Sequence, residues 1–149
     1  MNPLKNFEEF VKEGIVKIQQ PDFNRAKFLA KESEEQLSFI KEIVLKMGVD
    51  NKNSNSIIKL SYDIIMEMIR AEMLIRGYNA SGSYAHEAEV SYLGKLNFSE
   101  LDVQFLNNLR YSRNGITYYG KMFEEDYAKK VLDFLERIYS KLKNLMDHS

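Results

Sequence analysis

The chain contains no cysteine and only two prolines among its 149 residues. Without cysteine, disulfides, thiolate nucleophiles and zinc–thiolate centres are excluded, which agrees with an intracellular protein. The prolines stand at positions 3 and 21, and the seven glycines lie mostly between periodic segments, so long uninterrupted helices are expected. No apolar run approaches the ~20 residues that a membrane-spanning helix needs, so no membrane contact is expected.

Net charge is also nearly absent, at −1. No global field would therefore draw the protein to nucleic acid, and any such contact must come from a local patch. The first nine residues are acidic and periodic and lack the apolar stretch of a signal peptide, so we expect a cytoplasmic protein. With 149 residues, 44% of them hydrophobic, the chain is expected to form a single domain over 1–149.

Apolar residues recur at spacings of three and four through most of the chain, which indicates amphipathic helices. Two helices are expected within about 3–47, the first over 4–18, followed by a long central helix over 56–76 and a shorter one over 83–93. Another helix follows Ser99, and a last one covers about 124–146. Residues 78–82 are expected to form a turn, and no sustained alternation predicts a sheet. The predicted fold is an all-α, up-down bundle of five or six helices.

Helix ends are marked by suitable capping residues. Asp22 and Ser99 are side chains that cap helix N-termini, and Glu100 and Asp102 are acids in the first turn after Ser99. Gly48 suits the position after a helix that requires a positive φ.

One polar segment interrupts the helical pattern: Leu109-Arg110-Tyr111-Ser112-Arg113-Asn114-Gly115-Ile116-Thr117-Tyr118-Tyr119-Gly120. The sequence predicts that the helix capped by Ser99 ends at Arg113-Asn114-Gly115. A guanidinium near a core generally holds either another part of the protein or a ligand. No other segment offers comparable chemistry, so the function is expected to depend on this one.

This segment, where one bundle helix ends and the next begins, resembles the signature of the HEPN superfamily. Those small helical bundles carry an arginine, often followed by a polar residue, and then a histidine after four to six residues. Active members are metal-independent ribonucleases. Arg113 and Asn114 match the arginine and the polar residue. The resemblance covers a HEPN-like core of about 56–146, with the central helix, a connector containing a histidine, the motif helix and a closing helix in family order.

The family histidine should fall at Tyr118 or Tyr119, and this sequence has no histidine there. That histidine is expected to activate the RNA 2′-hydroxyl or to protonate the leaving oxygen. Tyrosine, with an ordinary pKa near ~10, stays protonated at neutral pH and is a poor base. The resemblance therefore implies a catalytic group of Arg113, Asn114 and Tyr118, with ribonuclease activity weakened or lost, and with no metal or other cofactor.

Binding does not require the histidine. Arg110 and Arg113 lie one turn apart on nearly the same helix face, and each planar fork can hold a phosphate. Tyr119 offers a ring on which a base can stack, and Lys121 follows the break. We therefore expect RNA or nucleotide to bind at Arg110, Arg113, Tyr119 and Lys121. The acids at 124–126 would repel phosphate, but they also suit the first turn of the last helix.

The resemblance also implies partners. In the family the motif cleft commonly forms between two protomers, so a homodimer is expected, with two Arg113-Asn114 pairs facing each other. Family members often accompany a small nucleotidyltransferase, the MNT-type antitoxin, which modifies a tyrosine near the motif. Tyr118 or Tyr119 could be the acceptor, although the family spacing would place that tyrosine at Gly120.

A second function stays open beside the first. The bundle could be a non-catalytic dimerisation or partner-binding module, such as the HEPN partner of an MNT-type enzyme in a toxin–antitoxin pair. Arg113 would then be structural, capping carbonyls or pairing with a buried acid, and Tyr118 or Tyr119 would pack into the core. His86 is expected to be solvated, and no metal site is predicted. Met66, Met68 and Met73 are expected to fill the core.

Overall fold

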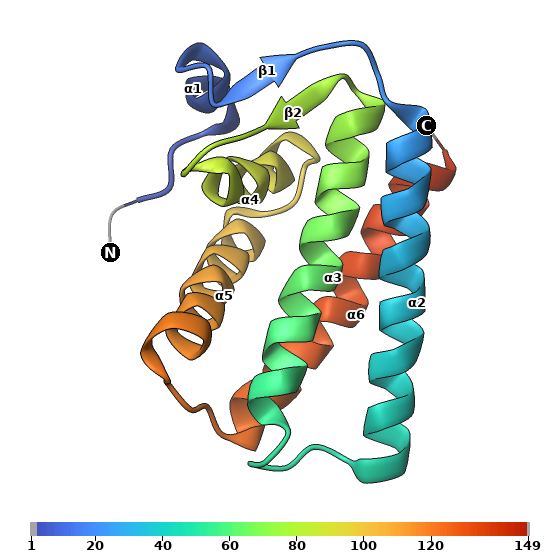
Figure 1. Cartoon of the computed structure of the whole chain (residues 1–149), viewed down its shortest axis with the longest axis vertical. Helices are drawn as coiled ribbons and strands as arrows, with labels where there is room; N and C mark the ends of the chain where they lie inside the picture. Colours follow the sequence, from blue (N-terminus) through green and yellow to red (C-terminus); the bar gives the residue numbers. More distant parts are fainter. Residues whose placement is uncertain (1–2, 149) are drawn as a thin grey trace.

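The computed structural model describes residues 3–148, which form a helical bundle with one small two-stranded ribbon (Figure 1). The elements in chain order are α1 (Phe7–Lys12), β1 (Val16–Ile18), α2 (Phe23–Met47), α3 (Ser54–Ile75), β2 (Tyr78–Ala80), α4 (Ala85–Lys95), α5 (Glu100–Tyr119) and α6 (Glu125–Asp147). The predicted all-α bundle of five or six helices is confirmed. Within the described range, no helix is both long and apolar enough to cross a membrane.

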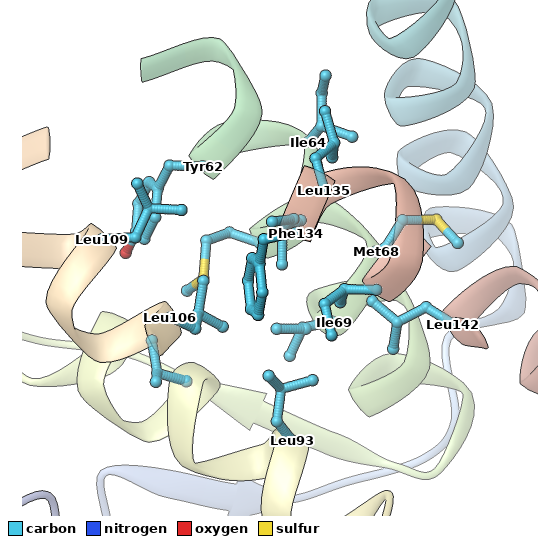
Figure 2. Close-up of a cluster of buried hydrophobic side chains, with 14 of the residues drawn as sticks. Tyr62, Ile64, Met68, Ile69, Leu93, Leu106, Leu109, Phe134, Leu135 and Leu142 are labelled. Atoms are coloured by element: carbon cyan, nitrogen blue, oxygen red, sulfur yellow. The ribbon is translucent and has the colours of Figure 1, made fainter. Parts of the chain in front are cut away.

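Helix α3 lies at the centre of the bundle. Figure 1 shows α2 on one side of it, α4 and α5 on the other, and α6 crossing it. Its apolar residues cover most of its circumference, so it can contact neighbours on several sides at once. Tyr62, Ile69, Leu106 and Phe134 belong to the main cluster between α3, α4, α5 and α6 (Figure 2).

The predicted caps are confirmed where hydrogen bonds show them. Asp22 accepts from the Arg25 N–H at 3.0 Å, and Ser99 accepts from the Asp102 N–H at 3.2 Å. Gly48 has a φ of 71°, as its place after α2 requires. Met66, Met68 and Met73 are buried, so their predicted role as core residues is confirmed as well.

The first predicted helix, over 4–18, is wrong in its second half. Helix α1 ends at Lys12, Gly14 adopts a φ of 80°, and the chain continues as β1. Strand β1 pairs antiparallel with β2, with Val16 opposite Ala80. The predicted turn over 78–82 is therefore partly a strand, and the expectation of no sheet is wrong. Three residue pairs are too few to produce an alternation that a sequence pattern can reveal.

Two features hold the β1–β2 ribbon in place: a close approach between two backbone segments and a cluster of aromatic rings. A Cβ on Gly77, whose φ is 82°, would lie 2.5 Å from the Gln19 carbonyl oxygen, so only glycine fits there. Phe7 of α1 contacts the rings of Tyr78 and Tyr92, with centroids 5.1 and 4.7 Å away. These contacts pack α1 against β2 and α4.

Candidate functional site

The motif segment lies on a continuous helix. Helix α5 runs through Arg113, Asn114 and Gly115 to Tyr119, so the predicted end at Arg113-Asn114-Gly115 is wrong. The helix ends at Gly120, which has a φ of 63°. Gly115 stays helical and buried, and its carbonyl accepts from the N–H groups of Gly120 and Lys121. The Lys121 side chain covers Gly115 so closely that a Cβ there would lie 2.9 Å from its Cδ.

A continuous helix separates Arg113 from the tyrosines. At 3.6 residues a turn, Tyr118 and Tyr119 lie ~140° and ~120° around the axis from Arg113. Both rings are largely exposed, at 68% and 79%. The alternative in which one of them packs into the core is therefore wrong. The structure does not bring Tyr118 or Tyr119 onto the face that carries Arg113.

Arg113 forms no side-chain hydrogen bond and no ion pair among residues 3–148. Its side chain is partly buried, and its Nε is inaccessible to solvent and forms no hydrogen bond. The neighbouring Asn114 is also partly buried. A buried donor that lacks an acceptor loses its hydration without compensation. The Arg113 guanidinium is therefore not used in any ion pair among the described residues.

Arg113 faces a group of polar side chains from α3 and α4. Its charge and that of His86 both act on Asp63, whose carboxyl is partly buried. Burial raises the pKa of Asp63 above its ordinary value, and the two basic groups oppose that shift. Tyr62 lies between the helices, with its hydroxyl 3.4 Å from His86 Nδ1. Burial raises the pKa of Tyr62, so this hydroxyl stays protonated at neutral pH.

Arg110, one turn before Arg113, is held within the protein. It is buried, its Nε donates to Asn107 Oδ1 at 3.1 Å, and its Nη1 lies 3.3 Å from Glu87 Oε1 of α4. The guanidinium also stacks on Tyr111 at 4.5 Å. These contacts join α5 to the start of α4. Of these two arginines on one face of α5, Arg110 forms an ion pair and Arg113 does not.

A second ion pair joins α3 to α4 behind this group. Arg70 donates to both carboxylate oxygens of Glu89, from Nε at 2.6 Å and from Nη2 at 3.0 Å. Glu89 is buried, and bidentate pairing offsets the loss of its hydration. Together with the Arg110–Glu87 pair, this contact ties the N-terminal part of α4 to both α3 and α5.

The chain after the motif is also fixed. Asn55 of α3 donates to the Lys121 carbonyl at 3.0 Å and accepts from the Phe123 N–H at 3.0 Å. The hydroxyls of Ser112 and Tyr127 lie 2.8 Å apart and join α5 to α6. The Lys121 side chain lies over Gly115 of α5. The connector from α5 to α6 is therefore held against the bundle rather than left free.

Spacing along the sequence did not reveal Tyr62, Asp63, Glu87 or Asn107 as parts of this group. Their relation to the arginines is tertiary, across three helices. One signal was available: Glu89 is an acid three and four residues before the buried Tyr92 and Leu93, on the apolar side of its helix. An acid on a buried face requires a partner, and Arg70 supplies it. Among residues 3–148, no three histidine, aspartate or glutamate side chains are arranged to hold a metal ion.

Comparison with known proteins adds no relative to this description. No protein-family model matches the chain, and no curated protein matches its sequence.

Proposed function

We propose that this protein binds RNA or a nucleotide through a phosphate held by Arg113, as the HEPN resemblance implies. The unpaired state of Arg113 carries the proposal. Among residues 3–148, four other arginines each have a carboxylate partner: Arg70, Arg76, Arg110 and Arg137. The Arg113 fork has no carboxylate partner among the described residues, and an unoccupied fork suits the bidentate geometry of a phosphate.

Of the two activities that the family resemblance implies, RNA or nucleotide binding has more support than RNA cleavage. Tyr118 lies ~140° around the helix from Arg113, so one protomer does not direct both groups at the same phosphate. A tyrosine hydroxyl is also a poor base at neutral pH. The structure offers Arg113 with Asn114 beside it, and we infer that any ribonuclease activity of Arg113, Asn114 and Tyr118 is weak. Lys121 and Tyr119 follow on the connector side and would extend the contact to a longer strand.

The test measures the affinity for fluorescently labelled single-stranded RNA by anisotropy. Arg113→Met keeps the apolar stem and removes the fork. We expect it to weaken binding about 10- to 100-fold, the worth of one or two charge-assisted hydrogen bonds. Arg25→Met is the matched control, because Arg25 is exposed on α2, across α3 from α5 (Figure 1). Equal affinities of wild type and Arg113→Met would refute the proposal.

The same samples test for cleavage. We expect no products from wild type above the level of Arg113→Met. Tyr118→His restores an imidazole at the family position, and products from this variant alone would support a site that has lost its acid–base group. Strong cleavage by wild type would contradict the assignment of a binding role.

A second function rests on a different surface. Tyr118, Tyr119 and Met122 are 68%, 79% and 80% exposed around the end of α5, although such large apolar side chains are rarely left together in water. We propose that this end of α5 joins two protomers or receives a partner such as an MNT-type nucleotidyltransferase, with a tyrosine hydroxyl as acceptor. A Tyr119→Ser, Met122→Ser variant should sediment as a monomer where wild type sediments as a dimer. A monomeric wild type would refute the homodimer.

A further inference from the structure

A cavity of about 420 Å³ opens beside Arg110, on the α5 face one turn before Arg113. The segment over 3–5, α1, the first turn of α4 and α5 enclose it. Its volume lies within the range of small-molecule sites in proteins. Another cavity of the same volume, between α2 and α6, is lined mainly by aliphatic side chains together with two lysines and two acids, and no aromatic ring lines it.

Three of the polar residues that line the cavity are already joined to one another: Glu87, Asn107 and Arg110. Glu87 lies 3.3 Å from Arg110, yet neither of its oxygens accepts a hydrogen bond from a side chain in the described structure. Arg110 uses its Nε on Asn107 Oδ1 and pairs its Nη1 with Glu87, which leaves the Asn107 amide N–H groups and Arg110 Nη2 without a partner among the described side chains. The cavity therefore offers one acidic acceptor and two sets of donors, fixed relative to one another.

Two tyrosines supply flat apolar surfaces at the same cavity. Tyr111 is fixed against the Arg110 guanidinium at 4.5 Å and is 42% exposed. Tyr84 lines the cavity from the start of α4, is 59% exposed and makes no capping hydrogen bond through its side chain. Aromatic faces beside hydrogen-bonding edges are the arrangement by which proteins receive unstacked bases.

The charges of the cavity favour a neutral occupant. Lys5 and Arg110 are balanced by Glu13 and Glu87, and Lys5 Nζ donates to Glu13 Oε1 at 2.8 Å. A phosphate would meet two carboxylates there, whereas a base would meet none of that repulsion. The unpaired Arg113 lies one turn away, about 5–6 Å between Cβ atoms, a separation that a ribose can span.

We propose that this cavity is a guanine-binding subsite for the nucleotide whose phosphate Arg113 holds. The proposal rests on the proposed function for the phosphate only. Guanine presents two adjacent N–H donors to a carboxylate such as Glu87, and the acceptors O6 and N7 to an arginine such as Arg110. Adenine presents one such donor group and no O6, so it satisfies fewer of these groups.

Nucleosides test the subsite without the phosphate. We expect guanosine to bind wild type at least 10-fold more tightly than adenosine or cytidine in calorimetric titrations. Tyr84→Ala should weaken guanosine about 10-fold by removing one stacking surface. Glu87→Gln should remove the preference for guanosine over adenosine. Phe28→Ala, which removes an exposed ring on α2, is the control and should leave guanosine affinity unchanged.

The outcomes separate this inference from the proposed function. Equal affinities for guanosine and adenosine, or guanosine binding that is unchanged in Tyr84→Ala, would overturn the guanine assignment. If RNA binds in an Arg113-dependent way while guanosine does not bind at all, the subsite is wrong and the phosphate site stands. If guanosine binds as expected while RNA binding ignores Arg113, the subsite stands and the phosphate site is wrong.

Discussion

Arg110 and Arg113 allow the effect of one substitution on stability to be compared at two positions of the same helix. Both are arginines of α5, one turn apart, but only Arg110 has partners among residues 3–148. We predict that Arg110→Met lowers the free energy of unfolding and that Arg113→Met does not. Methionine keeps the apolar stem and a high helix propensity at both positions, so the difference isolates the guanidinium.

The magnitudes follow from the contacts. Removing the Arg110 guanidinium loses a charge-assisted hydrogen bond to Asn107, about 1.5–3 kcal/mol, and a stacking contact with Tyr111, about 0.5–1 kcal/mol. It also leaves Glu87 without its ion partner, although that carboxylate is 21% exposed and keeps some hydration. We expect a loss of about 2–4 kcal/mol. Arg113→Met removes a buried, unsatisfied Nε, so we expect no change or a gain of up to about 1 kcal/mol.

Urea unfolding followed by circular dichroism measures both values, with the slope of the transition as a check on the two-state assumption. A loss of 2 kcal/mol or more in Arg113→Met would show that Arg113 has a structural partner in solution, and the binding proposal would lose its main support. Arg137→Met, which removes a paired arginine of α6, serves as a further comparison because its carboxylate partner Asp102 is known.

Three further predictions concern the surroundings of the site. Gly120→Ala should cost about 1 kcal/mol in urea unfolding, because its φ of 63° disfavours a side chain although the space is open; no loss would mean that the end of α5 rearranges. The hydrogen bonds from Arg137 lower the pKa of Asp102, so their stabilisation is present above the ordinary carboxyl pKa and is lost as pH falls. Asp102→Asn should therefore cost about 1 kcal/mol at pH 7 and little near pH 2, and a cost independent of pH would contradict this account. Asp63→Asn should tighten RNA binding several-fold at pH 7 by removing a negative charge near Arg113, and wild type should approach the variant as falling pH protonates Asp63; weaker binding by the variant would place the phosphate elsewhere.

The helices were predictable because their signals are local. The caps at Asp22 and Ser99 and the stop at Gly48 depend on residues within one turn, and the structure contains each of them. The end of α5 was misjudged because a single glycine inside a helix costs only about 1 kcal/mol, which packing offsets. Gly115 is buried beneath Lys121, and Gly120 with its positive φ is the actual stop.

Part of the site was predictable because its signal is local in the sequence. The sequence singles out Arg113, but the absence of a hydrogen bond or ion pair at its guanidinium is a tertiary fact that no spacing reveals. The opposite holds for Arg110, whose two partners lie on its own helix and on α4. Glu87 was visible only as one acid in a polar helix. A helical sequence thus reveals which faces are apolar, but not which charged side chains meet across helices.

The β1–β2 ribbon has a consequence for the order of assembly. It pairs Val16 with Ala80, so it can close only after α2 and α3, which separate the two strands in sequence, have folded back on each other. The segment over 3–15 that walls the cavity beside Arg110 would then dock late and open first, while α3 stays closed. Native-state hydrogen exchange should show β1 amides exchanging faster than those of α3, and equal protection would contradict this order. Access to the cavity would thus be governed by brief release of the chain's first turns rather than by motion of the bundle.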